Sequence, residues 1–183
     1  GALAQYGAVL VDTRRAWVDE HRDEFARVCN AIGETGTVSL EYETQVERGA
    51  NTREALVLAL RDSRARDIQR CMTSAGPHRD DLIITIDGRD ARAFGSSGQQ
   101  RTAGIALRLL EARTLRAATG CHPVLLLDDP FAELDASRTQ RTLELLASDG
   151  EGQVILAVPR ADEIPPHFAR LPRWRMCAGV VTT

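Results

Sequence analysis

Apolar residues in the first part of the chain recur at two different spacings. From residue 1 to about residue 32 they return every three or four positions among charged residues, which predicts an amphipathic helix. Residues 38–42 instead alternate as Val-Ser-Leu-Glu-Tyr, and this pattern predicts a half-exposed strand. Asn51 or Thr52 is expected to cap a second helix that continues to about Met72.

The pattern changes after Gly76-Pro77, which interrupts the helical spacing. Residues 82–86 are rich in β-branched side chains and predict a strand, and Asp87-Gly88 after them is typical of a hairpin turn. Because a hairpin needs a returning strand, residues 91–94 are expected to run back beside the first one.

The second half of the chain alternates helices with short apolar strands. Helices are predicted at about 98–119 and 136–147, and strands at 123–128 and 154–158. Two apolar strands joined through a helix favour a parallel sheet and an α/β fold. Residues 124–127 are apolar at every position, so this strand is expected to be hidden on both faces.

Two adjacent carboxylates, Asp128 and Asp129, follow that apolar run. The carboxyl ends of strands in open α/β sheets are where ligands bind, and paired carboxylates are costly to bury without a cation or a donor. Successive strand residues point to opposite faces, so different roles are expected: Asp128 beside a magnesium ion and Asp129 orienting an attacking water. The alternative is a turn or helix-capping pair before Pro130.

The stretch Gly-Ser-Ser-Gly-Gln-Gln leads directly into the helix that starts near residue 98. A helix start offers unpaired amide donors and a partial positive charge, and therefore attracts phosphate. Ser96 and Ser97 add hydroxyl groups, and Gly98 permits close approach of the backbone. The alternative is an ordinary serine N-cap with no ligand.

The amino-acid composition argues against several classes of protein. All 23 basic residues are arginine, and against 26 acidic residues they leave a net charge of −3, which provides no overall basic field for a nucleic acid. No apolar run is long enough to cross a membrane, and no signal peptide is expected. The four cysteines lie far apart, which argues against a zinc site and favours a reduced compartment.

Three motifs in order resemble the carboxyl-terminal half of an ABC-type ATPase. The serine/glycine loop stands in the place of the signature sequence, the strand ending in Asp128-Asp129 in that of Walker B, and residues 132–135 (AELD) in that of the D-loop. GPHRDD at residues 76–81 makes the set similar to the RecF family of bacterial DNA replication and repair proteins. The resemblance is dense over residues 76–158 and looser before them.

The resemblance implies a role for each residue of the serine/glycine loop. Ser96 and Gly98 would contact the γ-phosphate of ATP held by a partner subunit. Ser97 belongs to the same ATP-binding loop, and Gln99 would support it.

It also implies roles for three carboxylates. Asp128 would serve Mg²⁺, Asp129 would activate the attacking water, and Asp135 would cross the dimer interface. The remaining polar candidates are residues without an inferred role: His78 and Arg79 match the family motif, whereas His21, His122 and His167 match nothing and are expected at the surface.

The organisation implied is a helical arm with a short strand at 1–75 and an ATPase head portion at 76–183. Two features depart from the family pattern. No Walker A loop of the form GxxxxGK[ST] is present, since the chain contains no lysine. Residues 157–159 read Ala-Val-Pro where these ATPases often carry a polar switch residue. The chain is therefore expected to be the carboxyl-terminal part of a longer ATPase and inactive alone.

By resemblance the complete protein is a cytoplasmic ATPase that binds DNA at gaps or single-strand/double-strand junctions. It would dimerise on ATP and help load recombinase with RecO and RecR in replication, recombination and the SOS response. Two alternatives stay open: a non-catalytic interaction module derived from an ABC-type head, and an SMC- or RecN-like ATPase fragment. The short arm and GPHRDD argue against the second.

Arginines on the second predicted helix are the best candidates for contacts with a DNA backbone. Helical spacing gathers them in pairs, although Asp62 and Asp67 partly offset their charge. The alternative is a solvated helix face. The candidates are Arg61, Arg64, Arg66 and Arg70.

Overall fold

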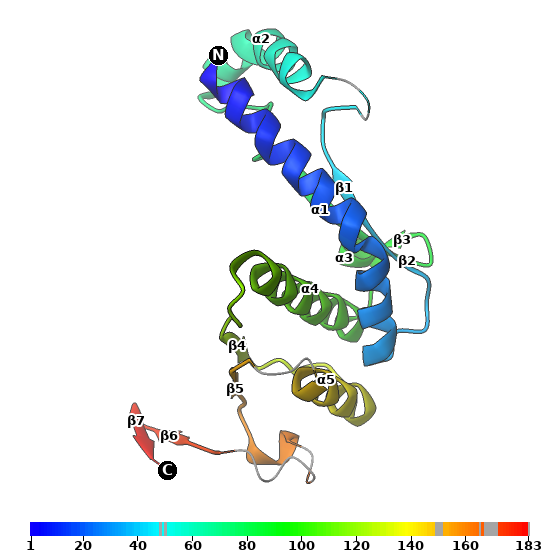
Figure 1. Ribbon diagram of the computed structural model, residues 1–183, viewed down its shortest axis with the longest axis vertical. Helices are drawn as coiled ribbons and strands as arrows, with labels where there is room; N and C mark the ends of the chain where they lie inside the picture. Colours follow the sequence, from blue (N-terminus) through cyan, green and yellow to red (C-terminus); the bar gives the residue numbers. More distant parts are fainter. Residues whose placement is uncertain (48, 50, 149–151, 165, 167–171, 183) are drawn as a thin grey trace.

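The computed structural model describes every residue except 48, 50, 149–151, 165, 167–171 and 183. The helices are α1 (Ala2–Ile32), α2 (Thr52–Arg70), α3 (Ala91–Phe94), α4 (Ser97–Thr119) and α5 (Ala136–Ser148), with a 3₁₀ turn at Ala161–Glu163. The strands are β1 (Val38–Glu43), β2 (Asp81–Ile86), β3 (Arg89–Asp90), β4 (Leu125–Asp128), β5 (Val154–Ala157), β6 (Arg175–Cys177) and β7 (Val180–Thr182). Figure 1 shows an elongated molecule with α2 at one end and β4, β5, α5 and the β6–β7 hairpin towards the other.

The long helix α1 and the shorter α2 form the narrow end of the molecule (Figure 1). Gly7 of α1 lets α2 approach closely, because a Cβ there would lie 3.3 Å from Leu56 Cδ1. Asn51 caps α2 as predicted, accepting a hydrogen bond from the Glu54 amide at 3.2 Å. A small apolar cluster closes this end: Ala4, Ala8, Val11, Val46 and Leu56.

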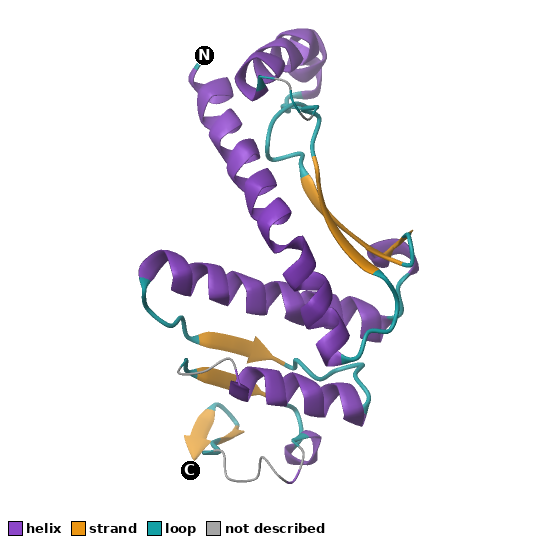
Figure 2. Cartoon of the chain, turned by 45° about the vertical axis from the view of Figure 1, so that its right-hand side comes forward, coloured by secondary structure: helices purple, strands orange, loops and turns teal. Residues whose placement is uncertain are grey.

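A three-stranded antiparallel sheet in the order β1-β2-β3 runs beside α1 (Figure 2). The predicted hairpin turn is confirmed, with both Asp87 and Gly88 at positive φ. The predicted return strand at 91–94 is wrong, since β3 ends after two residues and α3 begins. The carboxylate of Asp90 accepts hydrogen bonds from the Arg92 and Ala93 amides, and this N-cap starts a helix where the strand would continue.

The main core joins elements from both parts of the chain. The last turns of α1, the inner faces of β1 and β2, and one side of α4 and α5 meet in it, with Phe25, Leu40 and Leu110 almost fully buried. β1 and β2 also pair directly. A division into an arm and a head near residue 75 stays a prediction, and any such division leaves this core shared between the two parts.

The predicted parallel pair is confirmed: β4 and β5 lie side by side, with Asp128 opposite Ala157. The expectation that this strand is hidden on both faces is wrong. Leu125 and Leu127 pack against the core, whereas Leu126 is 69% exposed on the opposite face. Burial on two faces needs a second covering layer, and the described residues supply a layer on only one side.

Two of the three histidines expected at the surface are partly covered. His21 is half-buried, stacks on the Trp17 ring at 4.8 Å and bonds to the Trp17 carbonyl through Nδ1. His122 is half-buried between α4 and β4, and His167 lies outside the described residues. All four cysteines are free of disulfide bonds, and Cys29 is buried whereas the other three are exposed.

Candidate functional site

The serine/glycine loop (residues 96–99) forms the first turn of α4 and its cap. Ser96 Oγ accepts a hydrogen bond from the Gln99 amide at 3.2 Å, and Gln99 Oε1 accepts one from the Ser96 amide at 2.9 Å. This reciprocal pair is a capping box, so the expected N-cap is present. The box fixes the backbone of the loop, in which Ser96 and Ser97 are exposed, and the first amides of a helix have no partner within the helix.

The AELD segment (residues 132–135) lies directly against this loop. Ser97 Oγ donates to Glu133 Oε2 at 3.2 Å. A Cβ on Gly98 would come within 3.0 Å of the Glu133 carbonyl oxygen, so glycine is what allows the two backbones to approach. Two motifs that are 36 residues apart in the chain therefore form one surface.

The carboxylate pair lies at the end of β4, next to the AELD segment. Asp128 is exposed as the last residue of the strand. Asp129 is half-buried, donates its amide to the Ala157 carbonyl at 2.8 Å and has a φ of 44°, which turns the chain out of the sheet. Within the part of the chain that the structure describes, neither carboxylate has a hydrogen bond or an ion pair, so both are open to a ligand.

A tight turn leads from the carboxylates into α5. Phe131 is 5% exposed and anchors this turn, and Glu133 has a φ of 64°. Asp135 caps α5 by accepting the Arg138 amide at 2.8 Å, while the Asp135 side chain stays exposed. The turn therefore brings Asp128, Asp129 and Asp135 into one short segment between β4 and α5, and their roles towards a nucleotide stay predictions.

A polar cluster that the sequence did not point to contacts both the serine/glycine loop and Asp135. Glu34, 5% exposed, follows α1 and reaches Gln99 Nε2 at 3.4 Å and Arg138 Nη2 at 3.5 Å. Arg138 in turn donates to Thr102 Oγ1 at 3.0 Å and lies near Asp135. The three-residue spacing from Asp135 to Arg138 is a signal that sequence analysis could have used, whereas no local pattern marks Glu34.

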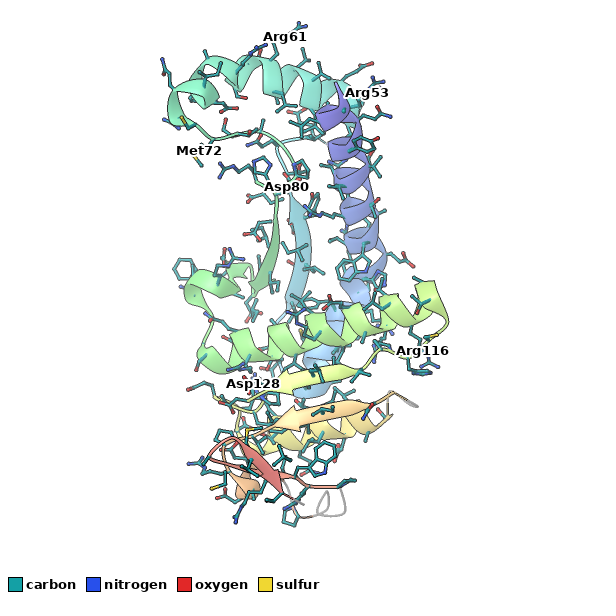
Figure 3. All side chains as sticks on the ribbon, turned by 90° about the vertical axis from the view of Figure 1, so that its left-hand side faces the viewer. Arg53, Arg61, Met72, Asp80, Arg116 and Asp128 are labelled. Carbon is teal, nitrogen blue, oxygen red and sulfur yellow. The ribbon has the colours of Figure 1, made fainter. Side chains whose placement is uncertain are left out.

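His78 and Arg79 lie away from the serine/glycine loop, near the junction of α2 and β2. His78 Nε2 bonds to the Thr73 carbonyl at 3.0 Å, and Arg79 donates two hydrogen bonds to the same oxygen. Asp80, in the same motif, accepts from the Tyr42 hydroxyl, and burial together with this contact raises the pKa of Tyr42 to about 12. Figure 3 shows Asp80 well separated from Asp128. The motif thus closes a turn between α2 and the sheet.

The arginines of α2 lie at the far end of the molecule from Asp128, as the label of Arg61 shows in Figure 3. Arg66 and Arg70 line a surface hollow of about 470 Å³ together with Asp62. All four candidate arginines of α2 are exposed, and within the described residues none has an ion pair or hydrogen bond from its side chain. The carboxylate of Asp67 accepts hydrogen bonds from Ser74 and Ser63, and these bonds hold the pKa of Asp67 below its usual range.

The described residues contain no group of three or more His, Cys, Asp and Glu side chains that could hold a metal ion by themselves. The helices in the described ranges also include none that is both long and apolar enough to cross a membrane.

A capped serine/glycine helix start, packed on a turn that follows a strand ending in two carboxylates, defines the carboxyl-terminal part of an ABC-type ATPase head. Comparison with known proteins narrows this class. RecF of Frankia alni is 40% identical over 191 residues, covering 99% of this chain and 50% of that protein. RecF of Roseiflexus castenholzii is 35% identical over 184 residues, covering 97% of the chain and 47% of that protein.

The solved structures that resemble this chain belong to the same family as its sequence relatives. A recombination mediator protein RecF–ATP of the RecFOR pathway has a TM-score of 0.74 at 29% identity, over 99% of this chain and 48% of that chain. The RecF–ATPrS structure has a TM-score of 0.73 at 30% identity. No family model matches the chain.

The chain belongs to the RecF family and matches the carboxyl-terminal half of the RecF structures. Its relatives are DNA replication and repair proteins, and the chain spans about half the length of the curated relatives it matches.

Proposed function

We propose that this chain supplies the signature and Walker B half of an ATP-dependent, dimeric DNA-repair ATPase. The observation that carries the proposal is the contact between the serine/glycine loop and the AELD segment, next to the exposed Asp128 and the half-buried Asp129. In this role the loop faces the nucleotide of a partner subunit, and the carboxylates face the nucleotide of their own. The relatives described as RecF–ATP and RecF–ATPrS support ATP as the nucleotide.

The serine/glycine loop suits a γ-phosphate for three physical reasons. Amides at the start of α4 and the helix dipole favour an anion there. Ser96 Oγ accepts the Gln99 amide, so its own hydroxyl hydrogen remains available to donate to a phosphate oxygen. Gly98 leaves room for close approach, while the hydrogen bond from Ser97 to Glu133 keeps the loop on the AELD segment.

The carboxylates have different environments and therefore different proposed roles. Asp128 is exposed at the strand end, and an open single carboxylate fits Mg²⁺, which is usually bound by one or two carboxylates together with phosphates and water. A bound Mg²⁺ would neutralise charge on the phosphates. Asp129, half-buried and turned out of the sheet, is placed to orient the attacking water. Asp135, exposed on the α5 cap, would meet the partner subunit.

The whole protein's action on DNA belongs to the same proposal. We propose a cytoplasmic protein that dimerises on ATP and binds gapped or junction DNA. It would assist recombinase loading with RecO and RecR, in recombination and the SOS response. The support is family membership and the name of the RecFOR pathway in which the structural relatives act.

The isolated chain is expected to bind Mg-ATP only weakly and to hydrolyse none. The lysine and amide cradle of a Walker A loop make most contacts with the phosphates, and this chain has no lysine. Isothermal calorimetry on the chain alone, beside the full-length gene product, measures this. Stoichiometric binding in the micromolar range by the chain alone would overturn the proposal, as would absence of ATP binding by the full-length protein.

The isolated chain is also expected to bind DNA feebly, because phosphate neutralisation supplies non-specific affinity and this chain has a net charge of −3. In the full-length protein, reversing Arg66 and Arg70 to glutamate should weaken binding. It should also reduce the slope of log K against log salt by about 2, since two phosphate contacts are lost.

Fluorescence anisotropy with a labelled gapped duplex at several salt concentrations measures both effects. Arg116→Glu, in the last turn of α4 and far from α2, is the control for a charge reversal elsewhere on the surface and should keep the parent slope. Tight binding by the isolated chain at physiological salt would contradict the first expectation. An unchanged slope in the double variant would exclude α2 as the DNA contact.

A further inference from the structure

Glu34 is the only buried charged side chain in the part of the molecule that the structure describes. It follows Gly33, whose φ of 123° ends α1 and directs the chain under the start of α4. A buried carboxylate is unfavourable unless hydrogen bonds and an opposite charge compensate it. The positions of its partners therefore show what the residue holds in place.

One oxygen of Glu34 connects the end of α1 to the serine/glycine loop. Oε1 accepts the Thr35 and Gly36 amides, each at 3.0 Å, and the Gln99 side-chain amide at 3.4 Å. The oxygen of the same Gln99 side-chain amide, Oε1, accepts a hydrogen bond from the Ser96 amide. A continuous set of contacts thus runs from Glu34 through Gln99 to the residue that caps α4.

The second oxygen, Oε2, faces Arg138. Glu34 Oε2 makes no hydrogen bond within the described residues, and its compensation is the Arg138 guanidinium at 3.5 Å. Arg138 also donates to the Gly98 carbonyl at 3.4 Å, and its Nε lies 3.9 Å from Asp135 Oδ2. The same guanidinium therefore contacts the serine/glycine loop and the residue that ends the AELD segment.

We propose that Glu34 is a positioning residue, whose pairing with Arg138 and Gln99 holds the serine/glycine loop and the AELD segment in one mutual geometry. The consequence for activity rests on the proposed function, in which both segments face nucleotide across a dimer interface. The two segments are far apart in sequence, and they meet through the hydrogen bond from Ser97 to Glu133 and the close approach at Gly98. The ion pair of Glu34 with Arg138 supplies a second connection between the two segments.

Glu34→Gln removes the negative charge of the side chain and keeps its size and shape. Glutamine keeps an oxygen that accepts the Thr35 and Gly36 amides, so the turn after α1 is retained. Its amide group presents hydrogens rather than negative charge to Arg138, so the half-buried guanidinium loses the buried carboxylate beside it. Glu24→Gln is the matched control: Glu24 also joins α1 to α4, through an ion pair with Arg113 at 2.5 Å, but in a different part of the interface.

Amide hydrogen exchange tests the positioning without nucleotide. In the full-length protein, Glu34→Gln should raise exchange about tenfold both at residues 96–99 and at residues 132–138, since local opening becomes easier. Glu24→Gln should leave both segments at the parent rate. If Glu34→Gln changes neither segment, or only one of them, Glu34 does not hold the two together and the inference is wrong.

Nucleotide assays test the functional consequence. Glu34→Gln should keep the parent affinity of the separate subunits for ATP, measured by calorimetry. It should lower kcat and the ATP-dependent dimerisation constant about tenfold to a hundredfold, because misplacement of a positioned group reduces the reaction and not the ground-state binding. The double variant with Arg138→Gln should be no worse than the poorer single variant, because both remove the same interaction.

The outcomes of these assays distinguish the proposed function from the positioning role of Glu34. A parent protein that neither dimerises nor hydrolyses ATP contradicts the proposed function, while the exchange measurement still decides whether Glu34 positions both segments. A parent that is active beside a Glu34→Gln variant with parent kcat and dimerisation contradicts the inference alone. A loss of ATP affinity equal to the loss in kcat points to a general structural role and also contradicts it.

Discussion

Asp129→Asn in the full-length protein is expected to lower the turnover of ATP by about two to four orders of magnitude while ATP still binds. The carboxylate acts in the chemical step by orienting the attacking water, and an amide cannot accept the proton. Asparagine tolerates the left-handed backbone at this position, where φ is 44°, so the variant should fold without strain. Steady-state turnover together with ATP calorimetry measures the two effects separately.

The matched control is Asp62→Asn, which makes the same chemical change at an exposed position on α2, at the far end of the molecule. It should hydrolyse ATP at the parent rate. Hydrolysis by Asp129→Asn at that same rate would show that the assigned role is wrong. A loss of ATP binding equal to the loss of turnover would place Asp129 in binding instead.

Ser96→Arg in the full-length protein should abolish ATP-dependent dimerisation, lowering the association constant by about a hundredfold or more. A large side chain at the start of α4 fills the space where the loop approaches the partner's phosphate, and interfaces tolerate such overpacking poorly. Ser96 is exposed, so the bulk does not enter the core. Sedimentation velocity with and without ATP measures the change.

Two controls separate obstruction from other effects of this substitution. Ser96→Ala removes the N-cap, which costs helix α4 about 1 kcal/mol, but it adds no bulk and should weaken dimerisation only in part. Ser148→Arg adds the same side chain at the exposed end of α5 and should dimerise like the parent. Full dimerisation by Ser96→Arg would exclude the loop from the interface.

Local chemistry was sufficient to predict most elements of this chain. The helical spacing of apolar residues predicted α1, α2, α4 and α5, and the alternation in residues 38–42 predicted the half-buried β1. Asp87-Gly88 and Asn51 act as turn and cap because their effects depend only on neighbouring backbone groups.

Three features were not predicted from the sequence pattern. Residues 91–94 have strand-forming neighbours, but the Asp90 cap and the packing of α3 against β2 and α4 make them helical. Leu126 is apolar like its neighbours, yet its exposure depends on whether another layer covers that face of β4. His78 and Arg79 sit in a family motif, and only the fold shows that they bond to Thr73 rather than to the serine/glycine loop.

The sequence by itself therefore determined the helices α1, α2, α4 and α5, the parallel pair and the family. The tertiary structure alone decided how the serine/glycine loop and the AELD segment are held together. Glu34 is 65 positions from Gln99, and Arg138 is 40 positions from Gly98, so no periodicity relates them. They meet because α4 and α5 both pack on α1, and a buried charge must then find its partner wherever that packing places it.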